Sequence, residues 1–160
     1  MDYVILQLII LLAVANGAPV LARALFNQSL NYPVDGGKRF IDGRPLLGAS
    51  KTIRGVSASV LATAAAARLM GFSFAFGAGF GTFAMMGDLL SSFIKRRMGL
   101  PPSTRANGFD QVPESLFPMF FASSQMELEM AQMALVVVLF FILEIVSSPL
   151  LFKLGIRKQS

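Results

Sequence analysis

The chain has 160 residues, of which 54% are hydrophobic and 14% are charged, and its net charge at neutral pH is +5. Its mean hydropathy of +0.64 excludes a soluble domain of this size, which could not bury so much apolar surface. The composition predicts an all-α integral membrane protein with room for about five spans of about 20 residues each. Histidine and cysteine are absent, which excludes imidazole and thiolate chemistry and any disulfide framework.

The apolar segments, taken in chain order, predict one membrane domain with five spans. The first span is interrupted by Asn16-Gly17 and Pro19, and the second is rich in alanine, a small residue that lets helices pack closely. The fourth span is short and contains prolines, so a re-entrant hairpin is the alternative to a full crossing. The expected spans are about 3–26, 56–70, 72–93, 112–122 and 130–152.

Basic residues are concentrated in two polar loops, 27–55 and 94–111, and in the C-terminal tail. The second and third spans join the two loops, which therefore share a side of the membrane, and the tail joins them if the fourth segment crosses. Because positive charge marks the cytoplasmic side, we expect the loops and the C-terminus in the cytoplasm and the N-terminus outside. No long basic arm is present, so nucleic acid is not an expected partner.

The third span ends in a line of polar side chains. In MMGDLLSSFIKRRMGL, residues 85–100, the side chains of Asp88, Ser92, Lys95 and Arg96 share one helical face. A carboxylate inside the membrane boundary is costly without a partner cation or a metal, and the lysine and arginine can hold phosphate oxygens. The alternative is a structural ion pair, with the basic residues acting only as a topology anchor.

The second polar loop brings another acid to the same side of the membrane. In STRANGFDQVPESLFP, residues 103–118, Asp110 opens the fourth span. Its carboxylate can converge with that of Asp88 where the third and fourth spans meet the cytoplasm. Two carboxylates suit Mg²⁺, which completes its coordination with waters and substrate phosphates. The alternative role for Asp110 is to cap the helix that follows it.

The first polar loop adds glycines and cations. Lys51, Thr52 and Arg54 precede the second span, and backbone amides at the start of that helix favour an anion. The alternative is a solvated loop whose charge only sets the topology. Taken together, three basic segments around two acids predict a site for a polyanion, either a nucleotide triphosphate or a phospholipid-like monoester.

The order of these residues resembles a known family. The pattern GD-L-x-x-S-F-x-K-R-R-x-G, from Gly87 to Gly99, followed by Asp110-Gln111, is similar to the phosphatidate cytidylyltransferase superfamily. With DGRPLLGASKTIRG in the first loop, the chain resembles archaeal CDP-archaeol synthases over essentially its whole length. The His-Gly-Gly segment of the bacterial and eukaryotic enzymes is missing, and Gln111 stands where they have arginine, which favours the archaeal branch.

The resemblance implies an enzyme that uses Mg²⁺ to transfer CMP from CTP to 2,3-bis-O-(geranylgeranyl)-sn-glycerol 1-phosphate, releasing pyrophosphate. By motif position, Asp88 and Asp110 are the expected metal ligands and, with Lys95, the expected catalytic residues. The expected substrate-binding residues are Lys38, Asp42, Lys51, Thr52, Arg54, Ser92, Arg96 and Arg97. The lipid phosphate is largely dianionic at neutral pH, so its attack on CTP needs no strong base.

Two functions of other classes compete with this one. A small transporter or channel subunit would need polar residues at mid-membrane depth, where Asn16 and Glu144 are the candidates. A non-catalytic assembly subunit is the other, and the sequence leaves open whether the protein forms a homodimer. No internal repeat of useful length is visible, which counts against a transporter built from paired halves. We therefore expect the enzyme.

Overall fold

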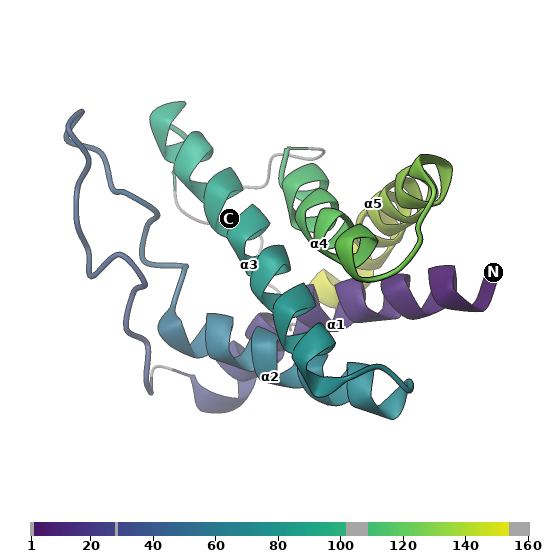
Figure 1. The fold of residues 1–160 in the computed structure, drawn as a ribbon. Helices are drawn as coiled ribbons and strands as arrows, with labels where there is room; N and C mark the ends of the chain where they lie inside the picture. The colour runs from purple at the N-terminus through teal and green to yellow at the C-terminus, as the bar shows by residue number, and fades with distance from the viewer. Residues whose placement is uncertain (1, 28, 102–108, 154–160) are drawn as a thin grey trace.

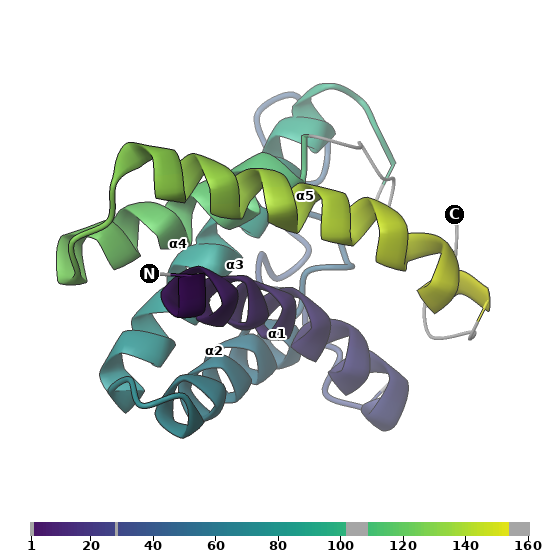
Figure 2. The same ribbon diagram turned by 90° about the vertical axis from the view of Figure 1, so that its right-hand side faces the viewer.

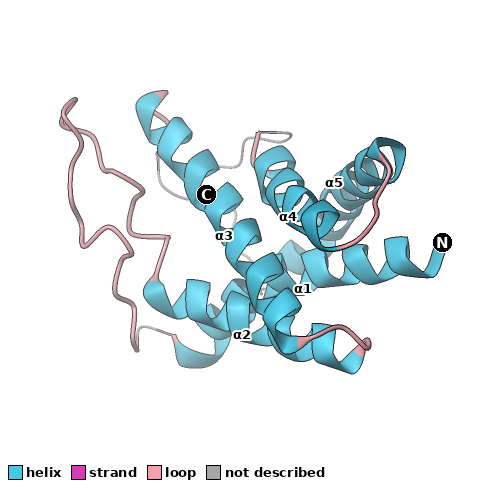
Figure 3. Ribbon diagram, in the orientation of Figure 1, coloured by secondary structure: helices cyan, strands magenta, loops and turns pink. Residues whose placement is uncertain are grey.

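The computed structural model describes residues 2–27, 29–101 and 109–153, which form five α-helices (Figure 1). Their bounds are α1 Asp2–Phe26, α2 Ile53–Leu69, α3 Phe74–Arg97, α4 Gln111–Gln125 and α5 Met130–Lys153. No strand occurs in these ranges (Figure 3), so the expected all-α class is confirmed. Part of the second polar loop and the basic tail beyond residue 153 lie outside the described residues.

One apolar core joins all five helices. Each helix contributes at least one side chain that is fully or almost fully buried, namely Leu11, Ala67, Phe80, Met119 and Phe140. The helix α3 lies between α2 and α4, while α5 packs against α4 and α1 (Figure 2). Burial of these side chains contributes about 1.5–3 kcal/mol for each large one, and this core fixes the helix on which most of the expected site residues stand.

The helix α1 runs without a break through the segment where the sequence predicted an interruption. Pro19 lies inside it and has no backbone N–H to donate to the carbonyl of Ala15. The hydroxyl of Ser59, on α2, donates to that carbonyl instead at 2.7 Å. Asn16 donates to the carbonyl of Leu12 in its own helix at 3.0 Å. The helix therefore continues because α2 satisfies the carbonyl that proline leaves without its usual partner.

Within the described residues, two helices are long and apolar enough to cross a bilayer, Tyr3–Phe26 with mean hydropathy 2.3 and Met130–Ser147 with 2.4. Both expose large apolar side chains, such as Leu21 and Val146, as expected of helices that face lipid. These features indicate a membrane location. The helices α2 and α4 have 17 and 15 residues, fewer than the roughly 20 of a full crossing, so the number of crossings stays a prediction.

Candidate functional site

A glycine brings α3 and α4 into close contact beside the acid predicted on α3. A β-carbon added at Gly87 would lie 2.1 Å from the carbonyl oxygen of Pro113 and 2.8 Å from the amide nitrogen of Glu114. No side chain fits in that space, so the two backbones can approach this closely only because residue 87 is glycine. The neighbouring Asp88 is thereby placed against the first turns of α4.

The carboxylate of Asp88 is bound by a lysine from the first polar loop. The Nζ atom of Lys51 lies 2.5 Å from Oδ1 and 2.6 Å from Oδ2 of Asp88. The carboxyl group of Glu114 lies within hydrogen-bonding distance of the same acid. The side chains of Lys51 and Asp88 are 22% and 19% exposed, so this ion pair is only partly open to solvent.

A second ion pair joins α3 to the start of α4. The Nζ atom of Lys95 lies 2.6 Å from Oδ1 of Asp110, and both side chains are mostly buried. Asp110 stands at the N-cap position of α4, but its side chain makes no capping hydrogen bond. Its carboxylate is therefore directed to α3 rather than to the end of its own helix. The guanidinium of the buried Arg96 also interacts electrostatically with Asp110.

The two ion pairs belong to one group of charges, which we call the central cluster: Lys51, Asp88, Lys95, Asp110 and Glu114. Burial by itself lowers the pKa of Lys51, but the charge and hydrogen bond of Asp88, with the charges of Glu114 and Asp110, outweigh it, so that this pKa lies above its usual value. Lys95 likewise interacts electrostatically with Asp88. Each of the two lysines therefore interacts electrostatically with both Asp88 and Asp110.

Two expected substrate-binding residues of the first loop contact the chain itself. The hydroxyl of Thr52 accepts a hydrogen bond from the amide of Gly55 at 3.2 Å and so caps α2. The guanidinium of Arg54 donates to the carbonyl oxygen of Asn27 at 3.1 Å and to that of Ser29. Both side chains thus stabilise the start of α2 and its contact with the end of α1.

The other expected residues fall into three environments. Ser92 is buried on α3, 3% exposed, and Lys38 is exposed on the first loop. Arg97 and Asp42 are bonded to each other, with 2.5 Å between Nη1 and Oδ1. The structure therefore gathers Lys51, Asp88, Lys95, Arg96 and Asp110 in one place, and it places the pair of Arg97 and Asp42 on a different side of α3.

Glu114 is a member of the central cluster that the sequence did not select. It lies four residues after Asp110, which is one helical turn on the same face, and its side chain is only 8% exposed. An acid at that spacing from Asp110 was the available signal. Its meeting with Asp88 depends on the close approach at Gly87, which the spacing alone does not show.

The carboxylates of the central cluster are the kind of oxygen ligand that Mg²⁺ prefers. Within the described ranges, no group of three or more His, Cys, Asp or Glu residues is arranged to hold a metal ion by itself. Mg²⁺ needs fewer protein ligands, because it is usually held by one or two carboxylates together with waters and substrate phosphates. Asp88 and Asp110 are two carboxylates of one cluster of charges, so the chemistry of the donor set fits this need.

Known proteins are similar to this chain over most of its length. The sequence profile described as "CarS-like: CDP-archaeol synthase" matches residues 1–78 and 68–159. The CDP-archaeol synthase of Hyperthermus butylicus is 43% identical over 107 residues, which are 61% of this chain and 59% of that protein. The CDP-archaeol synthase of Pyrobaculum calidifontis is 32% identical over 155 residues, which are 91% of this chain and 90% of that protein.

A solved structure has the same fold. It is described as an intramembrane enzyme for the biosynthesis of archaeal membrane lipids, and it superposes with a TM-score of 0.78 at 26% sequence identity, covering 89% of this chain and 90% of its own. The family profile spans nearly the whole chain, and so does the Pyrobaculum relative. The resemblance drawn from the two loop motifs is confirmed: the chain is an enzyme that belongs to the CDP-archaeol synthase family.

Proposed function

We propose that this enzyme uses CTP and Mg²⁺ to transfer CMP to 2,3-bis-O-(geranylgeranyl)-sn-glycerol 1-phosphate, giving a CDP-activated ether lipid and pyrophosphate. The observation that carries the proposal is the central cluster, in which a loop lysine pairs with an acid of α3 and a lysine of α3 pairs with the acid at the N-cap of α4. Electrostatic interactions link the two pairs. The relatives that match this chain are named for the synthesis of a CDP-activated archaeal lipid.

The ion pairs suggest an exchange of partners when the substrates bind. Asp88 and Asp110 would hold Mg²⁺, which supplies charge neutralisation across the phosphates and helps to align the attacking and leaving oxygens. The ammonium groups of Lys51 and Lys95, released from these acids, would then bind phosphate oxygens. Glu114, hydrogen-bonded to Asp88, keeps that carboxylate oriented toward the cluster.

The position of the central cluster in the helices suggests how each substrate reaches it. The central cluster lies near the C-terminal end of α3, whose last turn holds Lys95, Arg96 and Arg97. With basic loops in the cytoplasm, CTP reaches the cluster from the water, and the lipid phosphate reaches it from the inner leaflet with its chains among the helices. The lipid phosphate is the nucleophile, and because it is already largely dianionic the chain needs to position it rather than deprotonate it.

The test is release of pyrophosphate from CTP by the purified protein, with and without Mg²⁺ and the lipid phosphate. Pyrophosphate release that needs both is expected, and Asp88→Asn should lower it about 100-fold or more, because an electrostatic group at the reacting phosphates is lost. Thr82→Val is the matched control on α3, since Thr82 is exposed and bonds only the carbonyl of Ala78 in its own helix. Ion flux without pyrophosphate release would instead support a transporter.

A further inference from the structure

The three cations in the last turn of α3 do not all face the same neighbour: Lys95 faces the start of α4, and Arg97 faces the first polar loop. Lys95 and Arg96 are buried, and Lys95 pairs with Asp110 at the start of α4. Arg97 lies about 200° around the helix from Lys95, at 3.6 residues per turn, and it contacts the first polar loop. Arg97 is therefore not a third copy of the same phosphate-binding cation. Its surroundings indicate a different task.

The guanidinium of Arg97 contacts both the first loop and its own helix. It lies 4.6 Å from the ring centre of Phe40, on the loop, and 5.1 Å from that of Phe93, on α3. Its Nη1 donates to Oδ1 of Asp42 and its Nη2 to the carbonyl oxygen of Pro45, each at 2.5 Å. Both ends of the planar fork are used, which is a geometry that lysine cannot reproduce.

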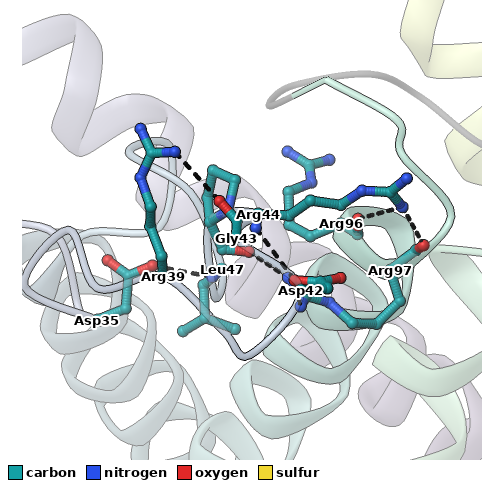
Figure 4. A network of polar contacts seen from close by, with 9 residues as sticks. Asp35, Arg39, Asp42, Gly43, Arg44, Leu47, Arg96 and Arg97 are labelled. Carbon is teal, nitrogen blue, oxygen red and sulfur yellow. Dashed lines mark hydrogen bonds and ion pairs between the residues drawn. The ribbon is translucent and has the colours of Figure 1, made fainter.

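The loop binds α3 in the opposite direction as well. The guanidinium of Arg44 donates to the carbonyl oxygens of Arg96 and Arg97 at the end of α3 (Figure 4). The backbone amide of Arg44 donates to Asp42 at 3.1 Å, which holds that acid toward Arg97. A cation on the last carbonyls of a helix is favourable because those carbonyls have no intrahelical partner. The contact is thus reciprocal and joins two folded segments.

The part of the loop that touches Arg97 is tied to the part that carries Lys51. The carboxylate of Asp35 accepts hydrogen bonds from the amides of Leu47 at 2.8 Å and Gly48 at 3.0 Å. The amide of Val34 donates to the carbonyl of Lys51 at 2.8 Å. A displacement of the loop at Arg97 is therefore passed to Lys51 through short hydrogen bonds rather than through free chain.

We propose that Arg97 and Asp42 are positioning residues that hold the first loop on α3 and thereby place Lys51 against Asp88. In this role neither side chain touches a phosphate, which differs from the substrate-binding role that the sequence predicts for both. The inference rests on the proposed function where it concerns the use of CTP. Its structural half, the docking of the loop, concerns only this chain.

The kinetic test compares single and double variants. Arg97→Ala and Asp42→Ala should each raise the KM for CTP about 10-fold or more, with a smaller change in kcat, because Lys51 is misplaced. The double variant should be no worse than either single variant, since both remove the same contact. Arg97→Lys should recover little, because its charge remains but its fork is lost.

Two controls separate this role from direct phosphate binding. Arg39→Ala removes a loop cation that donates only to the carbonyl of Gly43 in the same loop, and it should leave the KM for CTP unchanged. If Arg97 bound phosphate directly, Asp42→Ala would leave that KM unchanged or lower it, because the arginine would be freed, and Arg97→Lys would retain most activity. Either result would overturn the proposal.

Hydrogen exchange of the loop amides, residues 34–51, provides a reading that does not depend on activity. Exchange should be faster in Arg97→Ala and in Asp42→Ala than in the unaltered protein, and unchanged in Arg39→Ala. Unchanged exchange in the first two variants would refute the docking role even if the enzyme uses CTP. If the unaltered protein does not use CTP, the proposed function is wrong. The exchange data still decide whether Arg97 and Asp42 hold the loop on α3.

Discussion

The two halves of α3 use the same small residue for different purposes. In the first half, Gly77 and Gly81 let α2 approach, and an added β-carbon at Gly77 would lie 2.5 Å from the β-carbon of Ala67. In the second half, Gly87 lets α4 approach at Pro113. The first half meets apolar and small side chains, whereas the second half meets Lys51 and Asp110.

Under the proposed function, close packing serves stability in one half and chemistry in the other. Around the first half, the core of Phe76, Phe80 and Met119 is buried, and a lost contact there lowers the free energy of unfolding. Around the second half, buried charged groups are costly unless their partners stand within bonding distance. The second half of α3, which we call the polar half, therefore requires a fixed position of α4 and of the first loop. The first half, which we call the apolar half, makes no such ion pairs among the described residues.

The strongest way to break this comparison is to fill the glycine of the polar half. Gly87→Ala should lower activity about 100-fold, because the new β-carbon on α3 would push the carbonyl of Pro113, and with it α4 and Asp110, away from α3. Gly79→Ala is the comparison variant in the first half, since the three atoms nearest to its added β-carbon all belong to the ring of Phe121, the closest 2.3 Å away, so that it displaces a side chain rather than a backbone. Pyrophosphate release and thermal unfolding in detergent measure both variants. Equal losses in the two would show that the halves do not differ.

A smaller effect is expected at the end of the polar half. Lys95→Ala removes the ammonium group paired with Asp110 and should raise the KM for CTP about 10-fold, the loss of one hydrogen bond to a charged group. Membrane insertion should be unchanged, which can be checked by the amount of protein in the membrane fraction. An unchanged dependence on CTP would make Lys95 a structural cation like those of a topology anchor.

The loop beside the polar half should respond to pH through Asp35. Burial by itself raises the pKa of Asp35, but the backbone amides of Leu47, Gly48 and Gly37 outweigh it, so that this pKa lies below its usual 3.8. The acid therefore stabilises the fold above that usual value, and this contribution is lost as the pH falls through the lowered pKa.

Asp35→Asn should accordingly cost about 1–2 kcal/mol of unfolding free energy at pH 6, because an amide offers one acceptor oxygen in place of two. The difference from the unaltered protein should shrink toward pH 3. Glu127→Gln, at an exposed acid between α4 and α5, is the control and should show little change. Unfolding curves at the two pH values provide the measurement, and a difference that grows as the pH falls would contradict the assignment.

The smallest expected effect lies at the contact between α1 and α2, away from the central cluster. Ser59→Ala removes the hydroxyl that donates to the carbonyl of Ala15 and should cost about 1 kcal/mol of unfolding free energy. The KM for CTP should not change, since the hydroxyl of Ser59 bonds the backbone of α1 and no member of the central cluster. A fall in activity without a fall in stability would mean that the two regions are coupled.

The sequence predicted the helices well because apolar runs of sufficient length are visible without any knowledge of packing. It also singled out Asp88, Lys95 and Asp110, which the structure brings into linked ion pairs. It predicted a break in α1, because the hydroxyl that satisfies the carbonyl before Pro19 comes from another helix. The pairing of Arg97 with Asp42 was equally out of reach, since 55 residues separate them and only the folded loop brings them together.

The most direct test of the central claim is whether Asp88 and Asp110 act as one unit. Pyrophosphate release that depends on Mg²⁺ and the lipid phosphate should be measured for Asp88→Asn, Asp110→Asn and the double variant. We predict that each single variant loses about as much activity as the double variant, because both acids serve the same bound ion. Activity close to that of the unaltered enzyme in either single variant, or losses that simply multiply in the double variant, would contradict a shared metal site.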